Sequence, residues 1–290
     1  MKKNIKIAIF SPSSPLKNPE KLRSGLEIAR QNLPTAQFIP EEPLSNSNLP
    51  YLASTDTSQA EAFSKLLENK DLDYIWFVRG GYGSIRWLEQ VKWPKATLPV
   101  PIGFSDPTSI LNIIVSKGGK AIHGPMLSTL KNTQPYCRDL LFKILSGSSM
   151  IGQKWQGQPL LEGIAKGPLI GGNLATILST LGTSLEPLWE GGLLFLEDYH
   201  EPLYKLDRMF TQLLLSDRLN KVSGIVLGQF LSLGKEEKFL KPLLLDRLKN
   251  LGIPIIWKVP SGHGPLNEPL ILGAEHHLDG KKGELTLVNH

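Results

Sequence analysis

Cysteine is nearly absent from this sequence. The 290 residues include a single cysteine, Cys137, so no disulfide can form within the chain. Cys137 lies in a segment that we expect to be helical, without an evident neighbour to activate its thiol. We therefore interpret it as a small apolar residue rather than a catalytic nucleophile. Such cysteine usage is typical of a reducing compartment, and we expect the protein in the cytoplasm.

Long apolar runs are absent as well. No segment approaches the roughly 20 apolar residues of a membrane span, so we expect no membrane partner. The apolar run at residues 5–10 is too short for the core of a signal peptide, and Lys6 interrupts it. We interpret this run as the first strand of the fold.

Charge is sparse and only mildly one-sided. Charged residues make up 20% of the chain, with 32 Lys and Arg against 27 Asp and Glu. The basic residues are scattered and are not interleaved with aromatic residues, so we expect no nucleic-acid partner. The net charge of +5 instead favours small anionic substrates. Because Cys and His are not clustered at the spacing of metal ligands, neither a metal nor a cofactor is expected.

The order of apolar and polar segments predicts the fold. The chain is long for one domain and suits two domains that share a site. In the first half, expected strands alternate with helices of about 10–15 residues, which is typical of βαβ units and a parallel sheet. A glycine-rich stretch without periodicity follows. We predict an α/β fold with an N-terminal domain at 1–148, a linker at 149–163 and a C-terminal domain at 164–290.

The segment 98–108 is the most informative part of the chain. It predicts a buried strand that ends at Gly103 and a helix that begins at Pro107. Ser105 lies at the break, where its hydroxyl would be exposed beside the unpaired N–H groups of a helix N-terminus. A serine in that position is suited to attack an acyl group. The alternative is that Ser105 or Asp106 only caps the helix.

A serine nucleophile needs a base, and the sequence has six histidines. His263 is the strongest candidate, because the glycines on both sides of it leave its imidazole open to another surface. His123 follows an expected strand and is the second candidate. His276 and His277 lie in a polar segment that we expect to be a solvated turn.

The base in turn needs an acid to orient it. Glu197 and Asp198 follow the apolar segment 192–196, which predicts a buried strand. Charge at the end of a buried strand is costly unless it is paired or functional. Glu197 is therefore a candidate for the orienting acid, with Asp198 as its rival. A salt bridge between Glu197 and Arg208 is the structural alternative.

A glycine-rich loop, Arg-Gly-Gly-Tyr-Gly at residues 79–83, follows another expected strand. It lacks the Lys-Ser/Thr pair of a P-loop and the glycine spacing of a dinucleotide-binding motif. Its N–H groups fit better as one half of an oxyanion hole. The other half would be the amide of Asp106, the residue after Ser105.

With these motifs in this order, the chain resembles the LD-carboxypeptidases, serine peptidases that trim murein tetrapeptides. The resemblance covers nearly the whole chain. The motifs that carry it are Arg-Gly-Gly-Tyr-Gly-Ser (79–84), Gly-Phe-Ser-Asp-Pro-Thr (103–108), His-Gly-Pro-Met (123–126), Gly-Gly-Asn-Leu (171–174), Leu-Glu-Asp with the downstream Asp-Arg-Met (196–209) and Gly-His (262–263).

The resemblance implies both a fold and a set of roles. The implied fold is a Rossmann-like N-terminal domain and a smaller β-rich C-terminal domain, with the active site between them. The implied assembly is a homodimer. The implied roles are Ser105 as nucleophile, His263 as base, Glu197 as orienting acid, and the amides of Gly81 and Asp106 as the oxyanion hole.

The chain departs from the family pattern at two places, and one further feature bears on the site. Pro107 stands where an aliphatic residue is usual, and proline suits a first helical position. Tyr199 and His200 replace a small aliphatic residue and a glycine, and we expect this bulk to affect substrate preference more than catalysis. The pair Gly264-Pro265 after the expected base is a third feature that could shape the site.

The expected reaction is hydrolysis of the amide between an L-centre of a diamino acid and a terminal D-alanine. Candidates for binding this substrate are Arg79, Tyr82, Arg86 and Asn173, and an ordinary ion pair is the alternative for each arginine. Two other functions stay open. One is a microcin-immunity-type peptidase that cleaves peptidyl- or aminoacyl-nucleotide amides, and the other is a non-catalytic module that binds cell-wall peptides.

Overall fold

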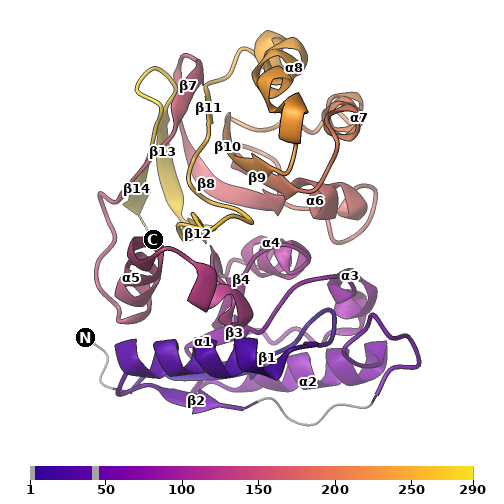
Figure 1. Cartoon of the computed structure of the whole chain (residues 1–290), viewed down its shortest axis with the longest axis vertical. Helices are drawn as coiled ribbons and strands as arrows, with labels where there is room; N and C mark the ends of the chain where they lie inside the picture. The colour runs from indigo at the N-terminus through magenta and orange to yellow at the C-terminus, as the bar shows by residue number, and fades with distance from the viewer. Residues whose placement is uncertain (1–3, 41–45, 290) are drawn as a thin grey trace.

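The protein is built around two β-sheets, one in each half of the chain (Figure 1). The structure, a computed structural model, describes residues 4–40 and 46–289. The two sheets confirm the predicted α/β fold with a parallel sheet in the N-terminal half. Within the described residues, no helix is both long enough and apolar enough to cross a membrane.

The N-terminal sheet has six strands in the order β12-β5-β4-β3-β1-β2. Its five strands from the N-terminal half are parallel, as the alternation of strands and helices predicts. The order reverses between β1 and β3, and ligands of such sheets bind at the carboxyl ends of strands near that point. The strands are β1 (Lys6–Phe10), β2 (Gln37–Ile39), β3 (Tyr74–Phe77), β4 (Val100–Gly103), β5 (Ala121–His123) and β12 (Leu270–Leu272).

Helices connect these strands, and side-chain caps mark the start of two of them. The side chain of Asn18 accepts a hydrogen bond from the amide of Glu20 at the start of the first helix, and Pro19 occupies its first position. The side chain of Thr55 caps the second helix in the same way. The helices are α1 (Pro19–Asn32), α2 (Asp56–Glu68), α3 (Ser84–Trp87), α4 (Thr108–Ser116) and α5 (Pro135–Leu145).

The C-terminal sheet has eight strands in the order β6-β14-β13-β8-β9-β10-β11-β7. The four central strands from β8 to β11 are parallel, and the outer strands are antiparallel. The strands are β6 (Lys154–Gln156), β7 (Gln158–Leu161), β8 (Ile164–Asn173), β9 (Leu193–Tyr199), β10 (Gly224–Leu231), β11 (Ile255–Trp257), β13 (Glu275–Asp279) and β14 (Glu284–Asn289). The helices of this half are α6 (Leu174–Thr180), α7 (Leu203–Leu215) and α8 (Leu240–Leu248).

The segment between the two halves differs from the expected linker. Residues 149–163 contain β6 and β7, which pair with β14 and β11 at the two edges of the C-terminal sheet. The chain also returns to the N-terminal sheet near its end, because β12 pairs with β5. Short strands at sheet edges carry little periodicity, which is why the sequence did not predict them.

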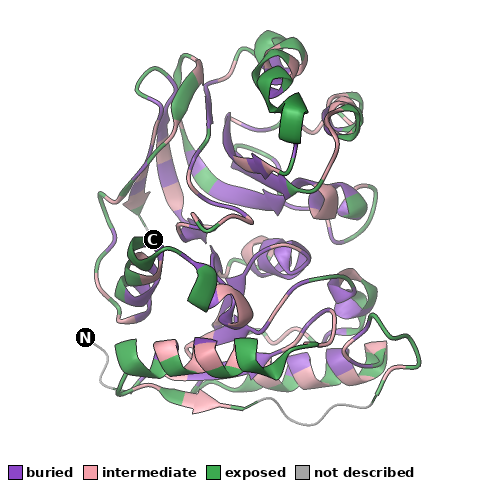
Figure 2. Cartoon of the chain, in the orientation of Figure 1, coloured by how far each residue is buried: buried purple, intermediate pink, exposed green. Residues whose placement is uncertain are grey.

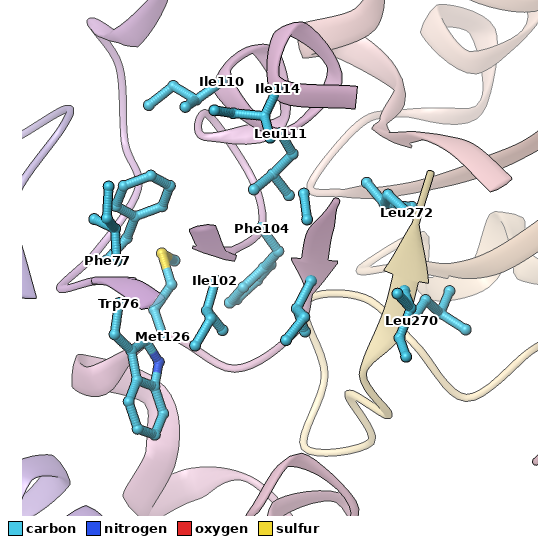
Figure 3. Close-up of a cluster of buried hydrophobic side chains, with 14 of the residues drawn as sticks. Trp76, Phe77, Ile102, Phe104, Ile110, Leu111, Ile114, Met126, Leu270 and Leu272 are labelled. Carbon is cyan, nitrogen blue, oxygen red and sulfur yellow. The ribbon is translucent and has the colours of Figure 1, made fainter. Parts of the chain in front are cut away.

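One apolar core spans both sheets, and a second is formed by residues within 170–257. Buried side chains of the N-terminal sheet, such as Ile102 and Ile122, belong to the same cluster as Phe195 and Val226 of the C-terminal sheet. Figure 2 shows the burial of both sheets, and Figure 3 shows Phe104 of the N-terminal half and Leu270 and Leu272 of β12 in one cluster. The core therefore fixes how the two halves sit against each other.

Two histidine predictions change with the structure. His276 is fully buried in β13, where its Nδ1 is 2.9 Å from the carbonyl oxygen of Ala274. His277 is half-buried on the same strand. The prediction of a turn was therefore wrong for both histidines, and that of a solvated side chain was wrong for His276, because alternate residues of β13 face the core.

Candidate active site

Ser105 lies on a sharp turn between β4 and α4, with a backbone φ of 68°. A non-glycine residue in this left-handed region stores strain, which clusters at functional positions. The capping alternative is not realised, since no side chain caps α4 and its N-cap residue is Pro107. The turn also packs against the glycine-rich loop, because a Cβ on Gly80 would lie 3.1 Å from the Ser105 hydroxyl oxygen.

The carboxylate of Asp106 ties three loops together. It accepts hydrogen bonds from the hydroxyl of Ser13 at 2.6 Å and from the amides of Ser84 at 2.9 Å and Gly83 at 3.3 Å. These donors belong to the loops after β1 and β3, while Asp106 follows β4. The buried carboxylate therefore holds the glycine-rich loop beside Ser105. Ser13 was not predicted, although its place after the first strand was the available signal.

Glu197 and His263 form a close pair. The Nδ1 atom of His263 is 2.7 Å from Oε2 of Glu197, whose side chain is fully buried at the end of β9. Because a carboxylate only accepts, Nδ1 carries the proton and Nε2 is left to accept one. The approach needs Gly262, whose φ is 142° and where a Cβ would lie 2.9 Å from the carboxylate. The alternative salt bridge from Glu197 to Arg208 does not form.

The pair also sets the proton affinity of His263. Burial alone would lower the pKa of its imidazole, because the charged form is poorly solvated. The charge and hydrogen bond of Glu197, with the charge of Asp198, outweigh burial and raise this pKa above its ordinary value. The imidazole of His263 therefore binds a proton more tightly than an ordinary histidine does.

Asp198, the rival acid, faces away from His263. Its carboxylate accepts hydrogen bonds from the amides of Ala175 and Tyr199 and from the side chain of Asn173. Burial, and then the charge of Glu197, raises the pKa of Asp198 to about 6. Its contacts anchor the start of α6, so the geometry favours Glu197 as the residue that orients the imidazole.

A cavity of about 540 Å³ brings Ser105 and His263 together. The ring of Phe104, the neighbour of Ser105, meets the imidazole edge-on with centroids 4.8 Å apart. Gly264 and Pro265 line the cavity next to His263, as their position after the expected base suggested. The described residues around it include no acid, and its cationic residues are Lys17, Lys21 and Arg79.

The two amides expected to form the oxyanion hole are available. Gly81 lines the cavity with a φ of 116°, and Asp106 directly follows Ser105. In the part of the chain that the structure describes, neither amide donates a hydrogen bond. Both can therefore serve a ligand.

The four predicted substrate-binding residues have different surroundings. Arg79 lines the cavity and donates to the carbonyl oxygen of Pro15 at 2.9 Å. The other three do not line it. The structure instead pairs Arg86 with Asp56 through two hydrogen bonds, packs the exposed Tyr82 against Tyr51, and buries Asn173 against Glu197 and Asp198. Sequence alone could not reveal the Asp56 partner, which is 30 residues away.

His123, the second candidate base, is fully buried between the rings of Phe104 and Phe195. Its Nδ1 lies 3.3 Å from the hydroxyl of Ser261, two residues before His263. Burial lowers the pKa of His123 to about 4. It does not line the cavity, so it supports the loop that carries His263 rather than facing a substrate.

The two halves of the site are joined by buried hydrogen bonds between α4 and β8. The side chain of Asn112 accepts from the amide of Gly171 and donates to its carbonyl oxygen, both at 2.9 Å. The hydroxyl of Thr108 accepts from the amide of Asn173 at 3.1 Å. Because Asn173 is paired in register with Glu197, these contacts fix the acid relative to Ser105.

Both halves of the chain match models of one protein family. Residues 7–124 match the model of the LD-carboxypeptidase N-terminal domain, and residues 166–278 match that of the LD-carboxypeptidase C-terminal domain. The murein tetrapeptide carboxypeptidase of Pseudomonas aeruginosa is 32% identical over 80% of both chains.

Solved structures share the fold. A muramoyltetrapeptide carboxypeptidase from Oxalobacter formigenes superposes with a TM-score of 0.84 at 24% identity, covering 98% of this chain and 99% of that one. MccF in complex with glutamyl sulfamoyl guanosine gives 0.83 at 21% identity, covering 100% and 97%. With both family models matching in order, the chain belongs to the LD-carboxypeptidase family and is an enzyme of the serine carboxypeptidase class.

Proposed function

We propose that this enzyme removes the terminal D-alanine of murein tetrapeptides, with Ser105 as nucleophile, His263 as base and Glu197 as the orienting acid. The proposal is carried by His263, which lines the same cavity as the strained Ser105 turn and lies 2.7 Å from the buried carboxylate of Glu197. A base oriented by a buried carboxylate beside a serine on a sharp turn is the arrangement of acyl transfer.

In the first half of the reaction, Nε2 of His263 takes the proton of the Ser105 hydroxyl as its oxygen attacks the scissile carbonyl carbon. The amides of Gly81 and Asp106 stabilise the oxyanion, each by about 3–4 kcal/mol. The C–N bond then breaks, and the protonated His263 gives its proton to the amine of D-alanine. An ester joins Ser105 to the remaining tripeptide.

Water completes the reaction. His263 removes a proton from water, whose oxygen attacks the ester carbonyl. When the ester bond breaks, His263 returns that proton to the Ser105 oxygen. The tripeptide leaves with a new carboxylate, and the enzyme regains its starting protonation state.

The charge of the cavity supports a carboxypeptidase. The substrate ends in a carboxylate, and the described residues that line the cavity provide three cations and no acid. Arg79 belongs to the same loop as Gly81, so a carboxylate near its guanidinium would lie close to the oxyanion hole. We propose Arg79 as the residue that receives the carboxylate of D-alanine.

The test is to incubate the enzyme with murein tetrapeptide and follow D-alanine by mass spectrometry. We expect release by the wild type and almost none by Ser105→Ala. An aminoacyl sulfamoyl nucleoside, assayed in parallel, tests the microcin-immunity alternative. Absence of D-alanine release, or release undiminished in Ser105→Ala, would overturn the proposal, and a dead enzyme that still binds the peptide would favour the binding-module alternative.

We further propose that the enzyme acts in the cytoplasm as a homodimer. The buried Cys137, whose thiol pKa is raised by burial, is compatible with a reducing compartment. Light scattering after size-exclusion chromatography gives the mass in solution, and a monomeric mass of 32.1 kDa at all concentrations would contradict the dimer.

A further inference from the structure

An exposed tyrosine stacks on the candidate base. The rings of Tyr199 and His263 are parallel to within 5°, with centroids 5.4 Å apart. Tyr199 keeps 42% of its surface exposed, so it does not serve the hydrophobic core. An aromatic ring at this distance and angle forms an offset stack, which orients the two rings relative to each other.

The backbone holds Tyr199 in that place. Tyr199 ends β9 directly after Glu197 and Asp198, and its amide donates to the Asp198 carboxylate at 2.7 Å. His200 follows with a φ of 65°, and its ring meets that of Tyr199 edge-on at 4.1 Å. The amide of His200 donates to the carbonyl oxygen of Leu231 on the next strand. The ring and the backbone of His200 therefore help to hold the side chain of Tyr199 in place.

Two aromatic rings thus enclose the imidazole from opposite halves of the fold. Phe104, the neighbour of Ser105, meets it edge-on, and Tyr199, two residues after Glu197, meets it face to face. The bond from Nδ1 to Glu197 fixes one atom of the ring but still permits rotation about that contact. A flat stack restricts this rotation and so keeps Nε2 aimed into the cavity.

We propose that Tyr199 is a positioning residue for His263, which holds the plane of the imidazole and stabilises its protonated form. The proposal rests on the function proposed above for His263. The electron-rich face of an aromatic ring attracts a nearby cation, so the stack favours the imidazolium that forms when His263 takes the Ser105 proton.

Other charged groups act on the same imidazole and have to be held constant. Glu197 and Asp198 on β9 raise its pKa, and they remain in every Tyr199 variant. The other titratable or cationic groups near it are His123 on β5 and His200 next to Tyr199, and Arg79, Lys17 and Lys21 line the same cavity.

The experiment compares Tyr199→Leu, which removes the aromatic face, with Tyr199→Phe, which keeps it. The pKa of His263 is followed by NMR of histidine-labelled protein, with the signal assigned through its loss in His263→Gln. We expect Tyr199→Leu to lower this pKa by about 0.5 unit, because a stack of this kind contributes modestly to the cation. Tyr199→Phe should keep the wild-type value.

The kinetic readout separates positioning from structure. In Tyr199→Leu we expect about a tenfold lower kcat with little change in KM, since misaligned groups slow the chemical step more than binding. The acid limb of the pH profile of kcat/KM should move to lower pH together with the pKa. A residue with a purely structural role would lower the melting temperature without moving either quantity.

A His263 pKa and a kcat that are unchanged in folded Tyr199→Leu would overturn the proposal. If that variant fails to fold, Tyr199→Gln repeats the test with a polar side chain that suits the exposed position. Because the NMR titration needs no substrate, its outcome is independent of murein cleavage. A wild type that releases no D-alanine would overturn the proposed function instead.

Discussion

The side chain of Asn112 and the backbone of Gly171 exchange two hydrogen bonds of 2.9 Å. The first residue belongs to the helix that follows Ser105, and the second to the strand that lies beside Glu197. Asn112 is only 2% exposed, so water cannot replace either bond. The geometry of the site thus depends on a buried contact between two residues that are not themselves candidates for catalysis.

We predict that Asn112→Ala destabilises the fold by about 2–4 kcal/mol, because two buried backbone groups of Gly171 lose their partners. Activity at low urea concentration should fall as well, because the position of Ser105 relative to Glu197 is no longer fixed. Urea unfolding measures the first effect. The matched control is Asn220→Ala, in which an exposed asparagine loses its bond to Asp217. Equal stability of the two variants would contradict the account.

Gly172→Ala should be still more harmful. The glycine has a φ of 140°, and a Cβ there would lie 2.6 Å from the hydroxyl oxygen of Thr108. The new methyl group would push β8 away from α4. Gly182→Ala is the control, since its φ of 77° carries backbone strain but its Cβ meets nothing within 4 Å. Melting temperatures compare the two, and a larger loss in the control would refute the prediction.

Glu197→Gln should lower kcat on the order of 10³–10⁴-fold, because the imidazole loses the carboxylate that fixes its tautomer. Removing that negative charge also lowers the pKa of His263, so the acid limb of kcat/KM should move to lower pH. Asp198→Asn should retain far more activity, since Asp198 makes no contact with His263. Assays of both variants across a range of pH measure kcat and kcat/KM. A larger loss of kcat in Asp198→Asn than in Glu197→Gln would mean that Asp198, and not Glu197, orients the imidazole.

His123 predicts an acid-sensitive fold. Its pKa is about 4 in the buried site and 6.5 as the ordinary value, so the unfolded chain binds the extra proton first. The stability this group provides is complete above pH 6.5 and is lost as the pH falls toward 4. Between pH 7 and pH 5, the titration of His123 lowers the free energy of unfolding by about 2 kcal/mol.

The variant that tests this is His123→Phe, which keeps a flat ring between the two phenylalanines and cannot titrate. Its free energy of unfolding should fall less between pH 7 and pH 5 than that of the wild type. Chemical denaturation at both pH values provides the comparison. The same acid dependence in both proteins would mean that His123 does not titrate on unfolding.

The local features of the site could be predicted from sequence, but its long-range pairings could not. The break after Gly103 and the apolar segment before Glu197 are visible because a buried strand that meets polar residues leaves a sharp pattern. The partner of Arg86 is 30 residues away and that of Asp106 is 93, and no periodicity connects such pairs. His276 shows the same limit, because the ring of Trp155 that packs against it comes from a distant segment.

We propose that Ser105 forms an ester with the tripeptide part of a murein tetrapeptide. The most direct measurement is rapid acid quenching during turnover, followed by peptide mapping by mass spectrometry. We expect a tripeptidyl adduct on the peptide that contains Ser105, and neither adduct nor D-alanine release in Ser105→Ala. An adduct on another residue, or D-alanine release by Ser105→Ala at the wild-type rate, would contradict it.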